Sequence, residues 1–169
     1  MEESQENAHS AKIKLKPWGR EIWFAQTEDY AGKILEVKEG HRLSMQYHEE
    51  KEETQHVFSG KIEMTYGKDK FNLKTVILVP GDTFHIAPYT IHRVKALENS
   101  KIFEVSTPHL NDIVKLSDDY GRVGKGNNED LDTKLHTHDV EFNVARTKAE
   151  NKDKNRKEAK ISNHLNYKK

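Results

Sequence analysis

Short runs of β-branched, aromatic and aliphatic residues, broken by turn residues about every 8–12 positions, limit most strongly what this chain can fold into. Such runs occur at residues 21–24, 33–38, 42–47, 61–66, 74–79, 83–86, 93–97 and 101–105. Turn residues separate them, as at Ser59-Gly60 and Pro80-Gly81. No amphipathic helical pattern occurs between residues 20 and 107, which argues against a parallel βαβ sheet. The pattern predicts an all-β sandwich or barrel.

Apolar residues are concentrated in the middle of the chain. Hydrophobic residues make up 34% and charged residues 33% of the 169 residues. Val, Ile, Leu and Phe gather in residues 31–107, whereas both ends are rich in Lys, Glu, Asp and Asn. We expect one domain at residues 13–123, preceded by a disordered lead at 1–12. A polar tail at 124–169, flexible or partly helical, is expected to follow it.

Charge and cysteine content argue against several classes of protein. The 28 basic residues balance the 28 acidic residues, so the chain lacks the positive charge of a nucleic-acid-binding protein. It contains no cysteine, which excludes disulfides and thiolate zinc sites. No apolar run approaches the roughly 18 residues of a membrane span, and the acidic N-terminus lacks a secretion signal. We therefore expect a cytoplasmic protein without nucleic-acid or membrane partners.

The segment between Gly40 and Gly60 carries the first residues of a metal site. Gln46 and His48 are two positions apart, so in a strand their side chains point to the same face. Glu53 follows a short charged turn and begins the returning strand, where it can face them. An amide oxygen, an imidazole and a carboxylate that converge on one point suit a divalent cation.

A second segment completes the ligand set. Pro80-Gly81-Asp82 predicts a tight turn, and His92 lies on a later strand that can return to the same pocket. We expect Gln46, His48, Glu53 and His92 to hold one divalent metal ion. Their mixed nitrogen and oxygen ligation is compatible with Zn, Mn, Fe, Co or Ni. Four protein ligands leave open coordination positions, as a catalytic metal requires.

The two segments resemble the two motifs of the cupin superfamily, whose fold is a double-stranded β-helix, or jelly-roll barrel. Most cupins have His where Gln46 stands. The run at residues 40–48 is similar to the cupin (C-terminal) domain of type II mannose-6-phosphate isomerases, which also place Gln there. That family's opening and closing motifs resemble Lys16-Pro17-Trp18-Gly19, residues 112–116 and residues 119–122. Tyr89 departs from the pattern, since the family usually has Gly there, so the lip of the pocket is expected to differ.

The resemblance implies an aldose–ketose isomerase that interconverts mannose 6-phosphate and fructose 6-phosphate in nucleotide-sugar or polysaccharide precursor metabolism. A metal in such an enzyme polarises the sugar carbonyl while a base moves a proton between adjacent carbons. Lys33 matches a Lys of the family on the strand before the first motif, and it is expected to point toward the substrate. Arg122 matches an Arg near the sugar pocket, and a guanidinium suits a phosphate. The sequence identifies no base.

Other functions stay open, and the chain need not be an enzyme. A non-catalytic cupin module that holds a metal and a sugar beside a separate nucleotidyltransferase fits the same residues. Another cupin enzyme, such as a dioxygenase, is a third hypothesis. Cupins commonly form dimers, and Ile22-Trp23-Phe24 is a candidate interface of a homodimer. We interpret His136-Thr137-His138 and the charged run at 148–160 as parts of a solvated tail.

Overall fold

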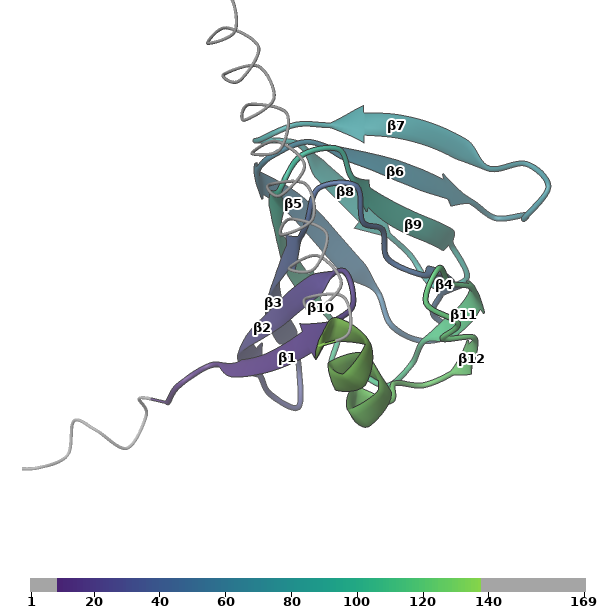
Figure 1. The fold of residues 1–169 in the computed structure, drawn as a ribbon. Coiled ribbons are helices and arrows are strands. Elements are labelled where there is room, and N and C mark those ends of the chain that lie inside the picture. The colour runs from purple at the N-terminus through teal and green to yellow at the C-terminus, as the bar shows by residue number, and fades with distance from the viewer. Residues whose placement is uncertain (1–8, 138–169) are drawn as a thin grey trace, which may run out of the picture.

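Two six-stranded antiparallel sheets face each other in the computed structural model, which describes residues 9–137 (Figure 1). The first sheet has the order β1 (Lys12–Lys16), β2 (Gly19–Gln26), β3 (Ala31–Val37), β10 (Ser100–Ser106), β5 (Glu53–Ser59) and β8 (Thr83–Ile86). The second has the order β12 (Gly124–Lys125), β11 (Val114–Ser117), β4 (Met45–Tyr47), β9 (Ile91–Ala96), β6 (Ile62–Gly67) and β7 (Lys74–Leu78). This arrangement is the predicted jelly-roll barrel of a cupin.

The inward positions of the strands change from apolar to polar along their length. On β3, Leu35 and Val37 lie in the hydrophobic core, whereas Lys33 is buried but polar. On β10, Ile102 lies in the core and Glu104 is the next buried position. Because both kinds of residue share the same strands, the core holds the polar end rigidly in place. The core consists of Trp18, Leu35, Val37, Leu43, Val57, Ile62, Met64, Leu78, Ile86, Val94, Ala96 and Ile102.

An apolar strip lies on the outer face of the first sheet. Phe24 on β2 and Phe58 on β5 are 42% and 58% exposed. Both rings pack edge-to-face against Phe103 of β10, at centroid distances of 6.4 and 5.2 Å. Trp23, the neighbour of Phe24, is buried instead. The segment predicted as a dimer interface therefore divides its side chains between the interior and this strip, and the homodimer stays a prediction.

The barrel continues past residue 123. Strand β12 pairs with β11, and a helix covers residues 129–137 beside β1 (Figure 1). Asn128 caps this helix, since its side-chain oxygen accepts the main-chain N–H of Leu131 at 3.0 Å. The predicted lead up to residue 8, His138 and the charged run at 148–160 lie outside the described residues. Within residues 9–137, no helix is long and apolar enough to cross a membrane.

Tyr89, in the turn between β8 and β9, has a φ of 58°, which is the left-handed conformation that Gly adopts most easily. Its N–H donates to the main-chain oxygen of His48 at 2.7 Å, and its ring stacks on Tyr47 with a centroid distance of 6.3 Å. The turn that the family makes with Gly is therefore made here by a non-glycine residue, which costs about 1–2 kcal/mol.

We expect Tyr89→Gly to be more stable than Tyr89→Ala by about 1 kcal/mol, because both lose the ring and only Gly escapes the left-handed strain. Urea unfolding of the two variants measures the difference. The same pair at Tyr47, which lies within strand β4, is the control. There Ala should be the more stable residue. An order in which Tyr89→Ala equals or exceeds Tyr89→Gly would contradict the strain.

Candidate metal centre and pocket

Three predicted metal ligands come together inside the barrel. His48 follows directly after β4, Glu53 begins β5, and His92 lies on β9 opposite Gln46. The Nε2 atom of His48 is 3.6 Å from one carboxylate oxygen of Glu53, and the Nε2 atom of His92 is 3.5 Å from the other. All three residues are buried, and one potential ligand atom from each lies within 4.8 Å of the others. These side chains can hold a metal ion.

Hydrogen bonds fix the tautomers of both histidines. The Nδ1 atom of His48 contacts the main-chain oxygen of Asp112, and the Nδ1 atom of His92 is 2.9 Å from that of Thr90. Because a carbonyl oxygen only accepts, each Nδ1 carries the hydrogen and each Nε2 presents a lone pair toward Glu53. The Nε2 atom of His48 is buried and has no hydrogen-bond partner among residues 9–137. A buried acceptor that is aimed at a carboxylate and left unpaired fits a site built for a cation.

Burial keeps both imidazoles uncharged. Loss of hydration lowers the pKa of His48 to about 4, with a further contribution from the positive charge of Lys51. The pKa of His92 is also lowered, mainly by burial. A metal binds neutral imidazole, so at neutral pH protons do not compete for these nitrogens.

Gln46 lies beside the three ligands. Its side-chain oxygen accepts the hydroxyl of Ser44 at 2.6 Å, and its amide nitrogen is 3.3 Å from the Nε2 atom of His92. Rotation of the amide by a half turn would bring the oxygen toward His92, and the Ser44 hydroxyl can accept as well as donate. The chemistry of Gln46 therefore allows it to serve as a fourth, oxygen ligand in the rotated orientation.

Sequence reasoning missed a buried charge cluster next to these ligands. The ammonium of Lys51 contacts the Glu53 carboxylate and is 2.8 Å from Glu104, which in turn lies 3.3 Å from the ammonium of Lys33. Burial opposes ionisation of Glu104, but the two lysines outweigh it and hold its pKa below the usual value. Lys51 is two residues before Glu53, so strand alternation is the signal that could have identified it as inward-facing.

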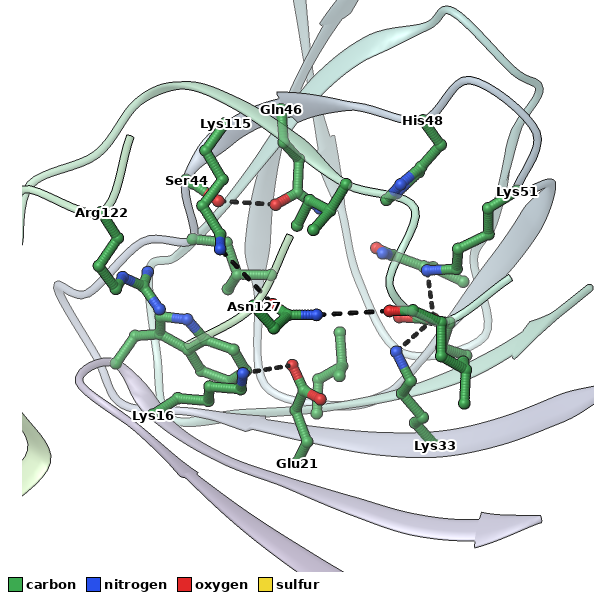
Figure 2. Close-up of a pocket in the computed structure, with 17 residues that line it drawn as sticks. Lys16, Glu21, Lys33, Ser44, Gln46, His48, Lys51, Lys115, Arg122 and Asn127 are labelled. Atoms are coloured by element: carbon green, nitrogen blue, oxygen red, sulfur yellow. Dashed lines mark hydrogen bonds and ion pairs between the residues drawn. The ribbon is translucent and has the colours of Figure 1, made fainter. Parts of the chain in front are cut away.

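Lys33, Lys51 and Glu104 line a pocket together with His48, whereas Glu53 and His92 lie behind its lining. Figure 2 shows His48 and Lys51 on one side of this pocket and Lys16 and Arg122 on the other. Lys33 points into this pocket, and its role toward a substrate stays a prediction. Two acidic residues and five basic residues line it, namely Glu21, Glu104, Lys16, Lys33, Lys51, Lys115 and Arg122. The lining carries more basic than acidic side chains, and Glu53, Asp118 and Asp132 pair with three of the cations from outside it. A ligand anion has to compete with these carboxylates. The volume of the pocket is about 50 Å³.

Arg122 does not present an empty guanidinium to this pocket. Its Nε and Nη2 atoms donate to Asp118 at 3.0 and 2.7 Å, and its Nη1 atom donates to Asp132 at 2.8 Å. The structure therefore places the predicted phosphate-binding residue in the pocket wall, with protein carboxylates on its donors. Its role toward a phosphate stays a prediction.

Solved structures with the same fold support this architecture. KdgF from a Halomonas species aligns with a TM-score of 0.51 and 22% identity over 60% of this chain and 89% of its own. Oxalate decarboxylase from Bacillus subtilis aligns with a TM-score of 0.55 and 17% identity over 63% of this chain and 30% of its own. The capsular polysaccharide assembling protein CapF from Staphylococcus aureus gives 0.51 and 15%, over 68% and 33%. At these identities the likeness shows the fold alone.

The family match covers most of the chain. Comparison with curated proteins gives no match. Residues 2–118 match the family described as mannose-6-phosphate isomerase C-terminal, a span that includes the three converging ligands and Gln46. That span also contains strands β1 to β11. The chain therefore belongs to the mannose-6-phosphate isomerase C-terminal family and folds as a cupin.

Proposed function

We propose that this protein is a metal-dependent aldose–ketose isomerase that converts mannose 6-phosphate to fructose 6-phosphate. The observation that carries the proposal is the convergence of His48, Glu53 and His92, with both Nε2 lone pairs facing the carboxylate, beside a pocket that His48 lines together with basic side chains. The family match supports the same substrate class.

The residues of the metal centre and of the pocket have different roles in the proposed reaction. A metal held by His48, Glu53 and His92 supplies a Lewis acid for the sugar carbonyl. The ammonium of Lys33 orients the substrate by donating to its oxygens. Glu104 is ionised beside Lys33 and can accept a proton once the substrate draws Lys33 away from it. The buried walls exclude water from the proton transfer.

The experiment is an assay of the purified chain after reconstitution with Zn, Mn, Fe, Co or Ni, each with mannose 6-phosphate as substrate. Fructose 6-phosphate is the expected product. Lys33→Met should lower kcat/KM by about 100-fold, because it removes a charged donor from the pocket. The control is Lys101→Met on β10, whose exposed ammonium pairs with Glu36 outside the pocket, and it should leave the rate unchanged. Absence of turnover in protein shown to contain each metal would exclude the isomerase.

One observation favours a second candidate, a metal- and sugar-binding module without catalysis. Tyr89, with a φ of 58°, stands at the pocket lip where the family usually has Gly, so the lip differs from that of the enzymes this chain resembles. For such a module, mannose 6-phosphate would raise the melting temperature of the metal-loaded protein without any conversion to fructose 6-phosphate.

A further inference from the structure

The carboxylate of Asp132, in the helix at 129–137, is bound by two cations at one side of the pocket. Its side chain is buried, and its two oxygens accept the ammonium of Lys16 at 2.8 Å and the Nη1 atom of Arg122 at 2.8 Å. Both cations also line the pocket (Figure 2). Two convergent cations that bind one carboxylate can equally bind a phosphate, which is the stronger acceptor.

The two cations that bind Asp132, Lys16 and Arg122, form the anion seat, and residues other than Asp132 hold this seat in place. Asp118 accepts two donors of Arg122 and fixes the plane of the guanidinium, which leaves Nη1 directed at the anion. Lys115 adds a third cation to the same wall, and its ammonium is held by the main-chain oxygen of Gly126 at 2.6 Å. Removal of the Asp132 carboxylate would therefore leave an ordered, positively charged position.

The helix that carries Asp132 is attached mainly by polar contacts. None of the residues at 129–137 belongs to either hydrophobic core cluster of the described chain. Besides those of Asp132, polar contacts of the helix at 129–137 to the barrel include an ion pair between Glu129 and Lys14 and a 2.8 Å contact from the His136 ring to the main-chain oxygen of Lys16. Release of the helix would expose little apolar surface, so its free-energy cost is small compared with that of opening a packed core.

The pocket must enlarge before it can hold a hexose phosphate. At about 50 Å³ the pocket is too small for a hexose phosphate. Its lining comes from strands of both sheets and from the loops between them, and Asn127, two residues before the helix, is its last member in the chain. Release of Asp132 from Lys16 and Arg122, together with movement of Asn127, would open the pocket at that side.

We propose that the helix at 129–137 is a displaceable cap, in which the Asp132 carboxylate occupies the seat of the ligand's phosphate group. The ligand class, a phosphate monoester, rests on the proposed function. A phosphate that binds Lys16 and Arg122 displaces Asp132, releases the helix and opens the pocket. The phosphate group of the ligand thus competes with the Asp132 carboxylate for Lys16 and Arg122, and this competition lowers the apparent affinity of the protein for the ligand.

Asp132→Asn tests the competition, with inorganic phosphate as the probe and calorimetry on the full chain as the readout. The variant keeps the shape of the side chain and removes its charge, so the Kd for phosphate should fall at least about tenfold. Asp130→Asn, an exposed position on the same helix away from Lys16 and Arg122, should leave Kd unchanged. Adding Arg122→Gln to Asp132→Asn should abolish the gain. An unchanged or higher Kd in Asp132→Asn, or a gain that persists without Arg122, overturns the proposal.

Hydrogen exchange of the unmodified protein provides a second test that needs no variant to fold. Phosphate, compared with chloride at equal ionic strength, should speed exchange of the amides at 130–137 and slow none of them. Unchanged or slower exchange there overturns the cap. Neither experiment measures turnover, so a failed isomerase assay with these results intact rejects the catalytic proposal alone. An active isomerase with unchanged exchange rejects the cap alone.

Discussion

Replacement of His92 by alanine is expected to remove metal binding and to lower kcat/KM for the proposed isomerisation by at least about 1000-fold, or ~4 kcal/mol of transition-state stabilisation. The physical reason is geometric. His92 supplies one of two neutral imidazole nitrogens that face Glu53, and a site left with one imidazole and one carboxylate binds a divalent cation far more weakly. Metal content after dialysis, measured by mass spectrometry, and the metal-induced rise in melting temperature report the loss.

The control for this prediction is His56→Ala, which also removes an imidazole from a central strand. His56 lies on β5, but its ring is on the outer side and contacts the hydroxyl of Thr83 at 3.1 Å. Metal content and melting behaviour should match those of the unmodified protein. If His92→Ala retains one equivalent of metal at unchanged affinity, His48, Glu53 and His92 are not the ligands.

Glu104→Gln is expected to destabilise the protein by about 3 kcal/mol. The substitution removes the carboxylate that pairs with the buried ammonium of Lys33, and it removes one of the two carboxylates that pair with Lys51. Urea unfolding measures this difference. Glu36→Gln on β3 is the matched control. Its carboxylate pairs with Arg20 and Lys101, whose side chains are largely exposed, so the loss there should not exceed about 1 kcal/mol. Equal losses in the two variants would contradict a buried, mutually dependent charge cluster.

The same cluster predicts a pH dependence of stability. Lys33 and Lys51 overcome burial and lower the pKa of Glu104 in the folded state relative to its ordinary value of 4.5. The folded state therefore binds fewer protons, and the stability that Glu104 contributes is fully present above pH 4.5 and declines as the pH falls below it. Glu104→Gln should show a shallower decline in unfolding free energy from pH 5 to pH 3 than the unmodified protein. Parallel profiles would mean that Glu104 does not carry this dependence.

Local pattern determined the strands and one side of the metal centre. Alternation of apolar and polar residues with regular turns is a property of neighbouring positions, so it predicted the two antiparallel sheets without knowledge of their pairing. The position of Glu53 at the start of the returning strand likewise predicted it to face His48. In the structure Glu53 is buried at the start of β5, whereas Glu50 and Glu52 are exposed.

Pairings between distant segments were decided by tertiary structure alone. Lys51 and Glu104 are 53 positions apart, and Lys16 and Asp132 are 116 apart. Lys51 and Asp132 lie in charged stretches that are typical of solvated surface, whereas Glu104 and Lys16 are charged positions within alternating runs. Only the closure of the barrel removes these charges from water and forces them to pair. Arg122 shows the consequence. A guanidinium suits a phosphate, so Arg122 was predicted to bind one. In the structure it binds the carboxylate of Asp132, which lies in the segment predicted as a polar tail. Local sequence pattern does not show which distant carboxylate will pair with a buried cation.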